Sequence, residues 1–303
     1  MSRKILFFIN PVSGGGNKLY LEKKILKKCA ENNVSFEILF TSAEGNYDFL
    51  REKIKEDFIT DIVICGGDGS IRPIVSHILN IDVNIGLLPL GSGNGLARSA
   101  GIPSNIDKAF QIIFTGQPSI TDAFLINKKL SCHVSGLGFD ALVAHEFSKQ
   151  KKRGLSSYTK EAIKNFFAAK TYSFKIESNE EIFTTDAFLI CVANSNQFGN
   201  NFKIAPKASL CDGLLDIVIL KKTNKPQIVI SFVKQILYGK VRQINEKNFH
   251  QKNVLYFQTR KLKIENPNDA PFHIDGDPAE TSKEFFIEVL PAAYKLIVPQ
   301  GSF

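Results

Sequence analysis

Three short segments of this 303-residue chain combine glycines with hydroxyl, amide or carboxylate side chains. They are Asn10–Gly14 (Asn-Pro-Val-Ser-Gly), Gly66–Ser70 (Gly-Gly-Asp-Gly-Ser) and Pro89–Gly95 (Pro-Leu-Gly-Ser-Gly-Asn-Gly). Glycine lets a backbone turn sharply, approach a ligand closely and aim several N–H groups at one point. A phosphate group suits such a loop, above all where a helix begins directly after it. One loop of this kind is equally a tight turn, but three in succession favour a phosphate-binding site.

Two widespread phosphate motifs are excluded. A P-loop requires Gly-Lys-Ser/Thr after its glycines, whereas the first loop continues as Gly-Gly-Asn-Lys-Leu at residues 15–19. A dinucleotide fingerprint needs its third glycine three places after the second, where Leu19 and Leu96 stand in the first and third loops. The loops therefore predict a nucleotide site of another design.

Several aspartates have a place in phosphoryl-transfer chemistry. Asp68 lies between two glycines of the second loop, where core packing does not require it, and it could organise Mg²⁺ and phosphate or the attacking hydroxyl. Asp275 and Asp277 flank a glycine after an apolar strand, and either could be the general base that takes the hydroxyl proton of the acceptor. A hairpin turn is the structural alternative for the second pair, because Asp-Gly is a common hairpin signal.

The elements that position these loops follow from hydrophobic periodicity. Apolar runs at 4–9, 34–40, 61–65 and 85–88 alternate with helical patterns, as in a parallel α/β sheet, and each glycine loop follows such a strand. Ligands bind at the carboxyl edge of sheets of this kind. Beyond residue 118 alternating segments such as 172–176 and 261–264 indicate a β-rich, sandwich-like second half, interrupted by helices near 158–169 and 226–238. We expect an α/β nucleotide-binding domain at 1–120 and a β-rich substrate domain at 121–303, with the last strand, about 291–303, packing back on the first domain.

With these residues in place, the chain resembles the diacylglycerol kinase catalytic-domain family, which includes sphingosine and ceramide kinases. Gly66–Ser70 resembles the family's GGDGT loop, Asn10–Gly14 its opening nucleotide loop, and Pro89–Arg98 its third loop. Later segments that resemble family elements are Gly136–Ala141 (Gly-Leu-Gly-Phe-Asp-Ala), Cys211–Asp216 (Cys-Asp-Gly-Leu-Leu-Asp) and His273–Asp277 (His-Ile-Asp-Gly-Asp). GGDG alone is shared with NAD kinases and phosphofructokinases, but the ordered set is more specific.

The resemblance implies a two-domain lipid kinase in which ATP and the acceptor meet in a cleft. The enzyme would transfer the γ-phosphate of ATP to a hydroxyl of diacylglycerol or a related lipid, a sphingoid base included, with ATP and Mg²⁺ as cofactors. The implied ATP contacts are Asn10, Pro11, Ser13, Gly14, Thr41, Gly66, Gly67, Asp68, Gly69, Ser70, Gly91, Ser92 and Asn94.

Further residue roles also come from the resemblance. Asp122 resembles a functional family aspartate, and Asp140 matches the position where sphingosine kinases meet the polar head of the substrate. A structural Mg²⁺ would be held by the side chain of Asp212 with the carbonyls of Ser209 and Leu214. A helix-terminal aspartate at 140 and a plain Asp-Gly turn at 212 are the structural alternatives.

This sequence departs from the family pattern at two places. The second loop continues with Arg72-Pro73 where the family has Asn-Glu, and Asp277 replaces a glutamate. These changes are the only support for a catalytically weak nucleotide- or lipid-binding regulator. The other alternative is an NAD-kinase-like small-molecule kinase, which would be expected to carry a later Asn-Glu motif in its substrate half. A phosphofructokinase would want an acidic Asp-Asn-Asp loop where this chain has Gly-Ser-Gly-Asn.

Composition sets the remaining limits. A hydrophobic fraction of 44 % is that of a globular protein, and five scattered cysteines argue against disulfides or a zinc site and for a reducing compartment. No apolar stretch approaches the roughly 20 residues of a transmembrane helix. The net charge of +8 favours anionic partners. We expect a cytoplasmic protein with peripheral contact at the inner membrane face and no nucleic acid partner, and a homodimer stays open. Two basic runs could dock on anionic lipid: Lys149, Lys151, Lys152 and Arg153, and later Lys221, Lys222 and Lys225.

Overall fold

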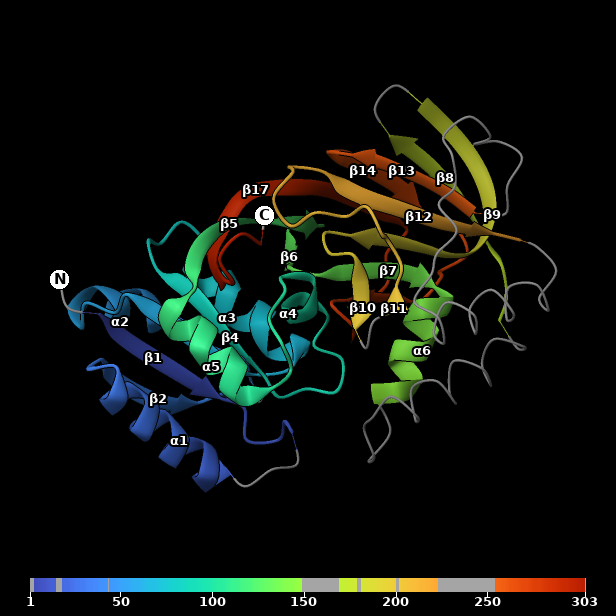
Figure 1. Ribbon diagram of the computed structural model, residues 1–303. Helices are drawn as coiled ribbons and strands as arrows, with labels where there is room; N and C mark the ends of the chain where they lie inside the picture. The colour runs from blue at the N-terminus through green and yellow to red at the C-terminus, as the bar shows by residue number, and fades with distance from the viewer. Residues whose placement is uncertain are drawn as a thin grey trace. The chain divides into compact units, whose positions relative to one another are not determined.

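The computed structural model describes residues 3–14, 18–42, 44–148, 169–178, 181–199, 202–222 and 254–302 (Figure 1). The chain divides into two compact units: unit 1 comprises Met1–Asp122 and Ala292–Phe303, and unit 2 comprises Ala123–Pro291. The helices expected near 158–169 and 226–238, the basic run at 149–153 and Lys225 lie outside the described residues, apart from Ala169.

Unit 1 is built on a parallel sheet. Its strand order is β2 (Ser35–Phe40), β1 (Lys4–Ile9), β3 (Asp61–Gly66), β4 (Asn84–Pro89) and the end of β17 (Glu284–Val298). All four pairings are parallel; Ile5, for example, lies opposite Phe36 on one side and Asp61 on the other. β3 is buried at every residue, which is why it reads as a continuous apolar run and not as an alternating one. The predicted parallel α/β architecture is confirmed.

Helices alternate with these strands. They are α1 (Lys18–Glu31), α2 (Leu50–Glu56), α3 (Ile71–Ile78), α4 (Gly95–Ser99) and α5 (Ile106–Thr115), with a single 3₁₀ turn, η1 (Asp68–Ser70), ahead of α3. α3 buries Ile71, Ile74, Val75 and Ile78, the i, i+3, i+4, i+7 set that its amphipathic sequence predicts. Pro73 lies in the first turn of α3, where a missing N–H is tolerated, so the helix forms in spite of it.

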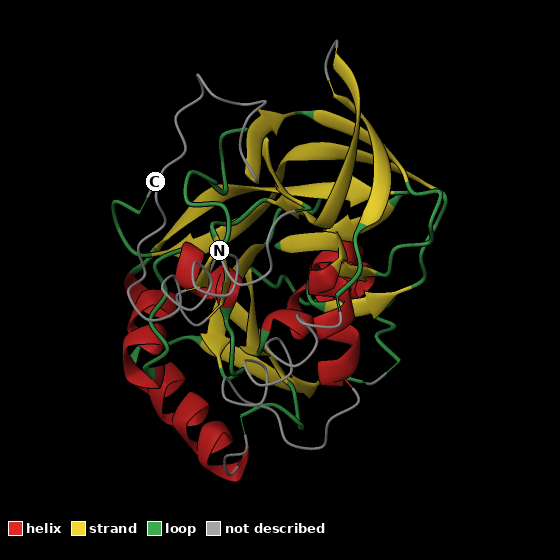
Figure 2. Ribbon diagram, turned by 90° about the vertical axis from the view of Figure 1, so that its right-hand side faces the viewer, coloured by secondary structure: helices red, strands yellow, loops and turns green. Residues whose placement is uncertain are grey.

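Unit 2 is rich in antiparallel strands, and Figure 2 shows the contrast with the helix-flanked strands of unit 1. Its main sheet runs in the order β16 (Asp277–Ala279), β15 (Phe272–Ile274), β7 (Val134–Gly138), β9 (Glu181–Ala193), β8 (Tyr172–Ser178), β14 (Lys261–Glu265), β17. β12 (Leu215–Lys221) pairs with β9 and β13 (Val254–Thr259). The remaining elements are β5 (Gln117–Ile126), β6 (Lys129–Ser131), α6 (Phe139–Ser148), β10 (Gln197–Gly199) and β11 (Phe202–Lys203).

The core of unit 2 comes from alternate residues of these strands. β14 alternates exposed Lys261, buried Leu262 and half-buried Lys263, and buried Ile264 follows. The buried members join Phe174, Ile190 and Phe285 in one hydrophobic cluster. The prediction of a β-rich second half is confirmed. Within the part of the chain that the structure describes, no helix has the length and apolar character to cross a membrane.

A buried ion pair joins the strands of unit 1 to α5. The carboxylate of Asp61, only 2 % exposed, accepts hydrogen bonds from Arg3 Nε (2.8 Å), Thr60 Oγ1 (2.7 Å) and Asn84 Nδ2 (3.1 Å). The guanidinium of Arg3 also donates to the carbonyl of Ile113 in α5 (2.6 Å). Asp61 and Arg3 together therefore link β3, β4, the residue before β1 and α5.

Replacing Asp61 by alanine should lower the free energy of unfolding of unit 1 by about 3–5 kcal/mol, because Arg3 then stays half-buried without its counter-charge. Urea unfolding of the full chain, followed by circular dichroism, measures the loss. The matched control is Asp82→Ala, also in unit 1, which removes an ion pair to Lys295 whose two side chains are 88 % and 46 % exposed. This control should change stability by less than about 1 kcal/mol. Equal losses for the two variants would contradict the structural role of Asp61.

Candidate active site

The three glycine loops meet at the carboxyl edge of the sheet of unit 1. They follow β1, β3 and β4, which are neighbours in the sheet and run in the same direction. Two backbone hydrogen bonds join them: Asn10 N–H donates to the carbonyl of Cys65 (2.9 Å), and Leu90 N–H to the carbonyl of Gly66 (2.8 Å). The predicted loops therefore form one connected surface.

Contact between the loops explains why three of their glycines are required. A Cβ on Gly91 would lie 2.6 Å from the Cα of Gly67, and a Cβ on Gly67 would lie 3.1 Å from the Cα of Gly91. Gly14 has φ +77°, and its Cβ would lie 2.9 Å from the carbonyl oxygen of Leu90. A side chain at any of these positions would push two loops apart. The glycines of this edge therefore serve backbone-to-backbone packing as well as any approach of a ligand.

Polar side chains of the loops are held in specific orientations. Asn10 Nδ2 donates to Ser70 Oγ (2.8 Å), and Asn10 Oδ1 accepts from the N–H of Val12 (2.9 Å). Asn94 has left-handed backbone dihedrals, is 4 % exposed and donates from Nδ2 to the carbonyl of Gly91 (2.7 Å). The Oδ1 atom of Asn94 is buried and receives no hydrogen bond from any residue that the structure describes. Since a buried acceptor without a donor is uncommon, this atom marks a place for a ligand donor or an ordered water.

Asp68 links the second loop to the third. Its Oδ2 accepts from the N–H of Gly95 (2.9 Å) and its Oδ1 from the N–H of Leu96 (3.1 Å), at the start of α4. The carboxylate thus satisfies two of the amides that a short helix leaves unpaired at its beginning. Asp68 has a structural role that its position between two glycines did not reveal.

The other predicted ATP contacts lie on the rim of this edge. Pro11, Gly14, Gly69 and Ser92 are exposed. Ser13, Thr41, Gly67 and Gly91 are half-buried, while Gly66 and Ser70 are buried. The backbone N–H of Thr41 donates to the carbonyl of Ile9 (2.9 Å), so the end of β2 is tied to the first loop.

Asp122, at the end of unit 1's first segment, is 3 % exposed. Its Oδ1 accepts from the N–H of Ala292 (2.8 Å), which begins the returning C-terminal segment of unit 1. Asp122 therefore has a structural contact that holds this segment.

In unit 2 the carboxylate of Asp275 organises a buried turn. Asp275 is 5 % exposed and has φ +52°. Its Oδ1 accepts from Ser131 Oγ (2.6 Å) and from the N–H of His133 (2.9 Å), and its Oδ2 accepts from the N–H of Cys132 (3.0 Å). Both oxygens are engaged within the protein, which fixes residues 131–133 against the Asp-Gly-Asp segment. Asp277, by contrast, is half-buried at the start of β16.

A buried histidine connects this segment to Asp140. The N–H of Gly276 donates to His273 Nδ1 (3.1 Å), so the ring proton of neutral His273 is on Nε2. His273 Nε2 lies 3.3 Å from Asp140 Oδ2, and both side chains are at most 5 % exposed. His273 therefore contacts both Asp140, at the start of α6, and the Asp-Gly-Asp turn. The sequence analysis included His273 in the family-like segment 273–277 but gave it no role, although a histidine two residues before Asp275 was a usable signal.

The predicted magnesium ligands lie in a tight turn before β12. Gly213 has φ +69°, and Asp212 Oδ1 accepts from the N–H of Leu214 (3.0 Å). The amide of Gln258 lies 3.4 Å from Asp212 Oδ2 and 3.3 Å from Asp216 Oδ2, so the two carboxylates are close to each other. Burial raises the pKa of Asp216 to about 6, and neighbouring Asp212 adds to this rise. The described residues contain no cluster of three or more His, Cys, Asp or Glu side chains that could hold a metal, so a cation in this turn would also need main-chain carbonyls. The donor chemistry fits that requirement.

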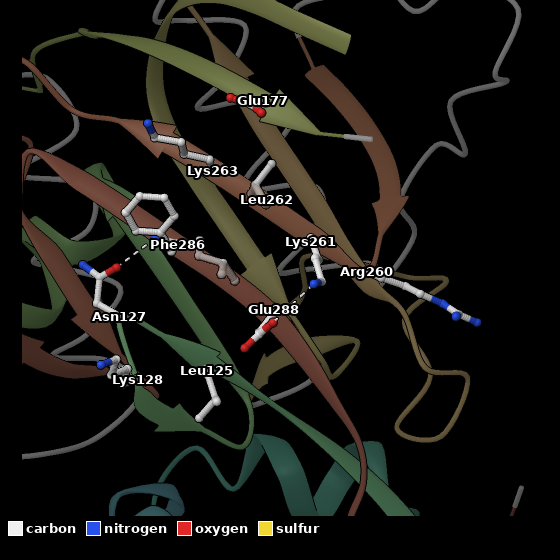
Figure 3. Close-up of a pocket in the computed structure, with 11 residues that line it drawn as sticks. Leu125, Asn127, Lys128, Glu177, Arg260, Lys261, Leu262, Lys263, Phe286 and Glu288 are labelled. Carbon is white, nitrogen blue, oxygen red and sulfur yellow. Dashed lines mark hydrogen bonds and ion pairs between the residues drawn. The ribbon is translucent and has the colours of Figure 1, made fainter. Parts of the chain in front are cut away.

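A groove of about 930 Å³ lies on the face of unit 2 formed by β5, β14, β17 and the turn after β5 (Figure 3). Phe286, 56 % exposed, lies beside it with the ammonium of Lys263 5.2 Å from its ring centroid, and Lys261 pairs with Glu288 at 3.8 Å. None of the predicted site residues lines this groove.

Comparison with known proteins places both units in one family. Residues 4–126 match the diacylglycerol kinase catalytic domain, and residues 133–298 match the YegS C-terminal NAD kinase beta sandwich-like domain. The second match supplies the sandwich-like character that the sequence predicted for the β-rich half.

Relatives and solved structures agree with this assignment. The chain is 29 % identical to a probable lipid kinase YegS-like protein of Shewanella frigidimarina, over 83 % of this chain and 80 % of the relative. It is 25 % identical to a protein of the same name from Yersinia pestis, over 91 % and 92 %. A crystal structure of a putative diacylglycerol kinase from Bacillus anthracis has the same fold, with a TM-score of 0.78, 20 % identity and 99 % coverage of both chains. The predicted resemblance is confirmed: this chain belongs to the diacylglycerol kinase catalytic-domain family, with a C-terminal domain of the YegS type.

Proposed function

We propose that this protein is an ATP-dependent lipid kinase that transfers the γ-phosphate of ATP to a hydroxyl group of diacylglycerol or a related lipid, a sphingoid base included. The observation that carries the proposal is the junction of three glycine loops at one sheet edge, with the buried Oδ1 of Asn94 lacking a donor. Family membership and relatives named probable lipid kinases support it.

ATP would bind along the loop edge of unit 1. Phosphate groups suit the exposed backbone of Gly69 and Ser92 and the side chains of Ser13 and Thr41. The adenosine part has hydrogen-bond donors, and Asn94 Oδ1 could accept a hydrogen bond from one of them. Asp68 would keep the second and third loops in register through its hydrogen bonds to Gly95 and Leu96, and it would also organise Mg²⁺ and phosphate there.

The acceptor would be prepared by residues of unit 2. Asp277 would be the general base for the acceptor hydroxyl, because it is half-buried, whereas Asp275 is buried and holds the turn through hydrogen bonds to both of its oxygens. Asp275 would then position the turn that carries Asp277. Asp140 would contact the polar head of the lipid, with its orientation held by His273.

A structural Mg²⁺ would be held by the carboxylate of Asp212 with the carbonyls of Ser209 and Leu214. The second carboxylate nearby, buried Asp216, favours a cation in this turn because ionisation of two adjacent carboxylates is otherwise unfavourable. Such an ion would supply positive charge that stabilises the turn before β12.

The proposed activity is tested by incubating the protein with γ-labelled ATP and a panel of acceptors: diacylglycerol, sphingosine, ceramide, a total lipid extract and NAD. We expect labelled phosphate in one or more lipids and none in NAD. Label in NAD alone would make this protein a small-molecule kinase. Nucleotide binding without label in any acceptor would favour a catalytically weak nucleotide- or lipid-binding regulator, the alternative that Arg72-Pro73 suggests.

The choice of base is tested by two conservative variants. Asp277→Asn should lower kcat by about 10²-fold or more with little change in the KM for ATP, because a general base acts in the transition state. Asp275→Asn keeps one acceptor oxygen but loses part of the cradle around residues 131–133, so it should lower thermal stability as well as activity. Steady-state kinetics and thermal melts of both variants separate the roles. Wild-type kcat in Asp277→Asn would remove this residue from the chemistry.

The contact between the loops is tested by Gly91→Ala. Its methyl group would lie 2.6 Å from the Cα of Gly67, and relief of such overpacking costs about 1–3 kcal/mol. We expect the KM for ATP to rise about tenfold or more, while the lipid KM changes little. Gly301→Ala is the control for backbone strain alone: it also lies in unit 1, its φ of +78° strains an alanine, and its Cβ meets nothing within 4 Å, so it should lower stability without raising the KM for ATP. An unchanged ATP KM in Gly91→Ala would show that ATP does not bind at these loops.

A further inference from the structure

The first helix of unit 1 has apolar residues on two faces, and only its inward face packs in the core. α1 buries Leu21, Ile25 and Cys29, which recur every four residues and form its inward face. In Figure 1 the helix lies beside β2, and no other labelled element lies on its outer side. The core of unit 1 is therefore complete without the outward face.

The outward face also has a regular pattern. Leu19, Lys23, Leu26 and Ala30 follow one another at intervals of four, three and four residues, so they form a single stripe along the helix, and all four are exposed. Leu19 is 56 % exposed and Leu26 is 60 % exposed, and adjacent Tyr20 is 62 % exposed. Isolated exposed leucines are ordinary, but two exposed leucines and an exposed tyrosine on the outward face of one helix indicate an interaction surface.

The charges around this stripe indicate the partner. α1 contains five lysines and two glutamates. Two of the lysines are engaged on the flanks, Lys24 with Asp107 (2.8 Å) and Lys28 with Glu31 (2.8 Å). Lys23, inside the stripe, forms no ion pair with any described residue, and Lys27 has only Glu31 at 3.9 Å. The exposed cations thus lie among the exposed leucines, which favours a surface that is anionic and apolar at once.

We propose that the outward face of α1, defined by Leu19, Tyr20, Lys23, Leu26 and Lys27, docks on the surface of an anionic lipid bilayer. Leucine and tyrosine side chains would enter the boundary between head groups and acyl chains, while the lysines extend to the lipid phosphates. The proposal rests on the proposed lipid kinase function, since a lipid acceptor has to be reached at a membrane. The basic run at 149–153 was the predicted docking segment and lies outside the described residues. The outward face of α1 consists of described, exposed residues.

The test is co-sedimentation of the full chain with vesicles of phosphatidylcholine alone and with rising fractions of phosphatidylglycerol. We expect binding that increases with the anionic fraction. It should weaken in 0.5 M salt, because a shorter Debye length screens the lysines from the lipid phosphates. Lys23→Gln with Lys27→Gln should weaken binding about fivefold per lysine at low salt, from about 1 kcal/mol for each cation near an anionic surface. Leu19→Gln with Leu26→Gln should weaken binding at least about tenfold and also at high salt, because apolar insertion is not screened.

The matched control is Lys55→Gln with Phe58→Gln, which changes one exposed lysine and one exposed large apolar side chain elsewhere on unit 1. This control should bind vesicles as the wild type does. Circular dichroism melts of all variants check that the exposed substitutions leave the fold intact. The proposal is overturned if both α1 variants bind vesicles as the wild type does, or if the control loses binding to the same extent as they do. It is also overturned if binding of the wild type does not depend on the anionic lipid fraction.

Two readouts separate this proposal from the proposed activity. A kinase assay with a short-chain acceptor dissolved in detergent should give equal rates for wild type and α1 variants, whereas the assay on vesicles should show the loss. Vesicle binding without any labelled lipid would overturn the kinase proposal and leave the docking surface standing. A concentration-dependent dimer in analytical ultracentrifugation that the leucine variant abolishes would assign the face to a second copy of the chain and overturn docking on lipid.

Discussion

The contact between the backbones of Gly67 and Gly91 is the constraint on which the loop edge of unit 1 depends. Two parallel strands, β3 and β4, end side by side, and their following loops must turn in the same small space. A Cβ on Gly91 would lie 2.6 Å from the opposite backbone, so the two loops can approach only as glycine chains. The hydrogen bond from Leu90 to Gly66 and the two bonds to Asp68 complete the junction. A rigid edge of this kind can hold phosphate groups without reorganisation, which is what phosphoryl transfer requires.

Several buried or half-buried aspartates of this protein organise the backbone. Asp61 holds Arg3 and Asn84 beside β3, Asp68 accepts from the first N–H groups of α4, and Asp275 holds residues 131–133. Carboxylates suit these positions because each has two oxygens that accept several N–H or O–H groups, and charge-assisted bonds are stronger than neutral ones. The same saturation leaves Asp275 little capacity to receive a proton from a substrate, so in our proposal Asp275 positions the turn and half-buried Asp277 is the base.

The pairing of Asp140 with His273 joins two segments that the family resemblance had assigned separately. Gly136 makes this pairing feasible, because a Cβ at that position would collide with the Asp140 carboxylate. The bond from Gly276 to His273 then extends the connection to the Asp-Gly-Asp turn. One histidine ring therefore lies between the proposed head-group contact and the turn that carries the proposed base.

The sequence by itself determined the parallel α/β half, the three loops at its carboxyl edge, the β-rich half and the family. These features depend on local information: apolar runs, helical spacing, glycine turns and the order of short motifs along the chain. The tertiary structure alone decided the roles of individual residues within them. Asp68 meets Gly95 and Leu96 at separations of 27 and 28 residues, and Asp275 meets residues 131–133 at 142 to 144. Whether a carboxylate is saturated, a glycine is in contact with another loop, or a leucine of α1 faces outward depends on such distant neighbours. A local pattern contains no information on them, because the same Asp-Gly or Leu-Lys spacing is compatible with either environment.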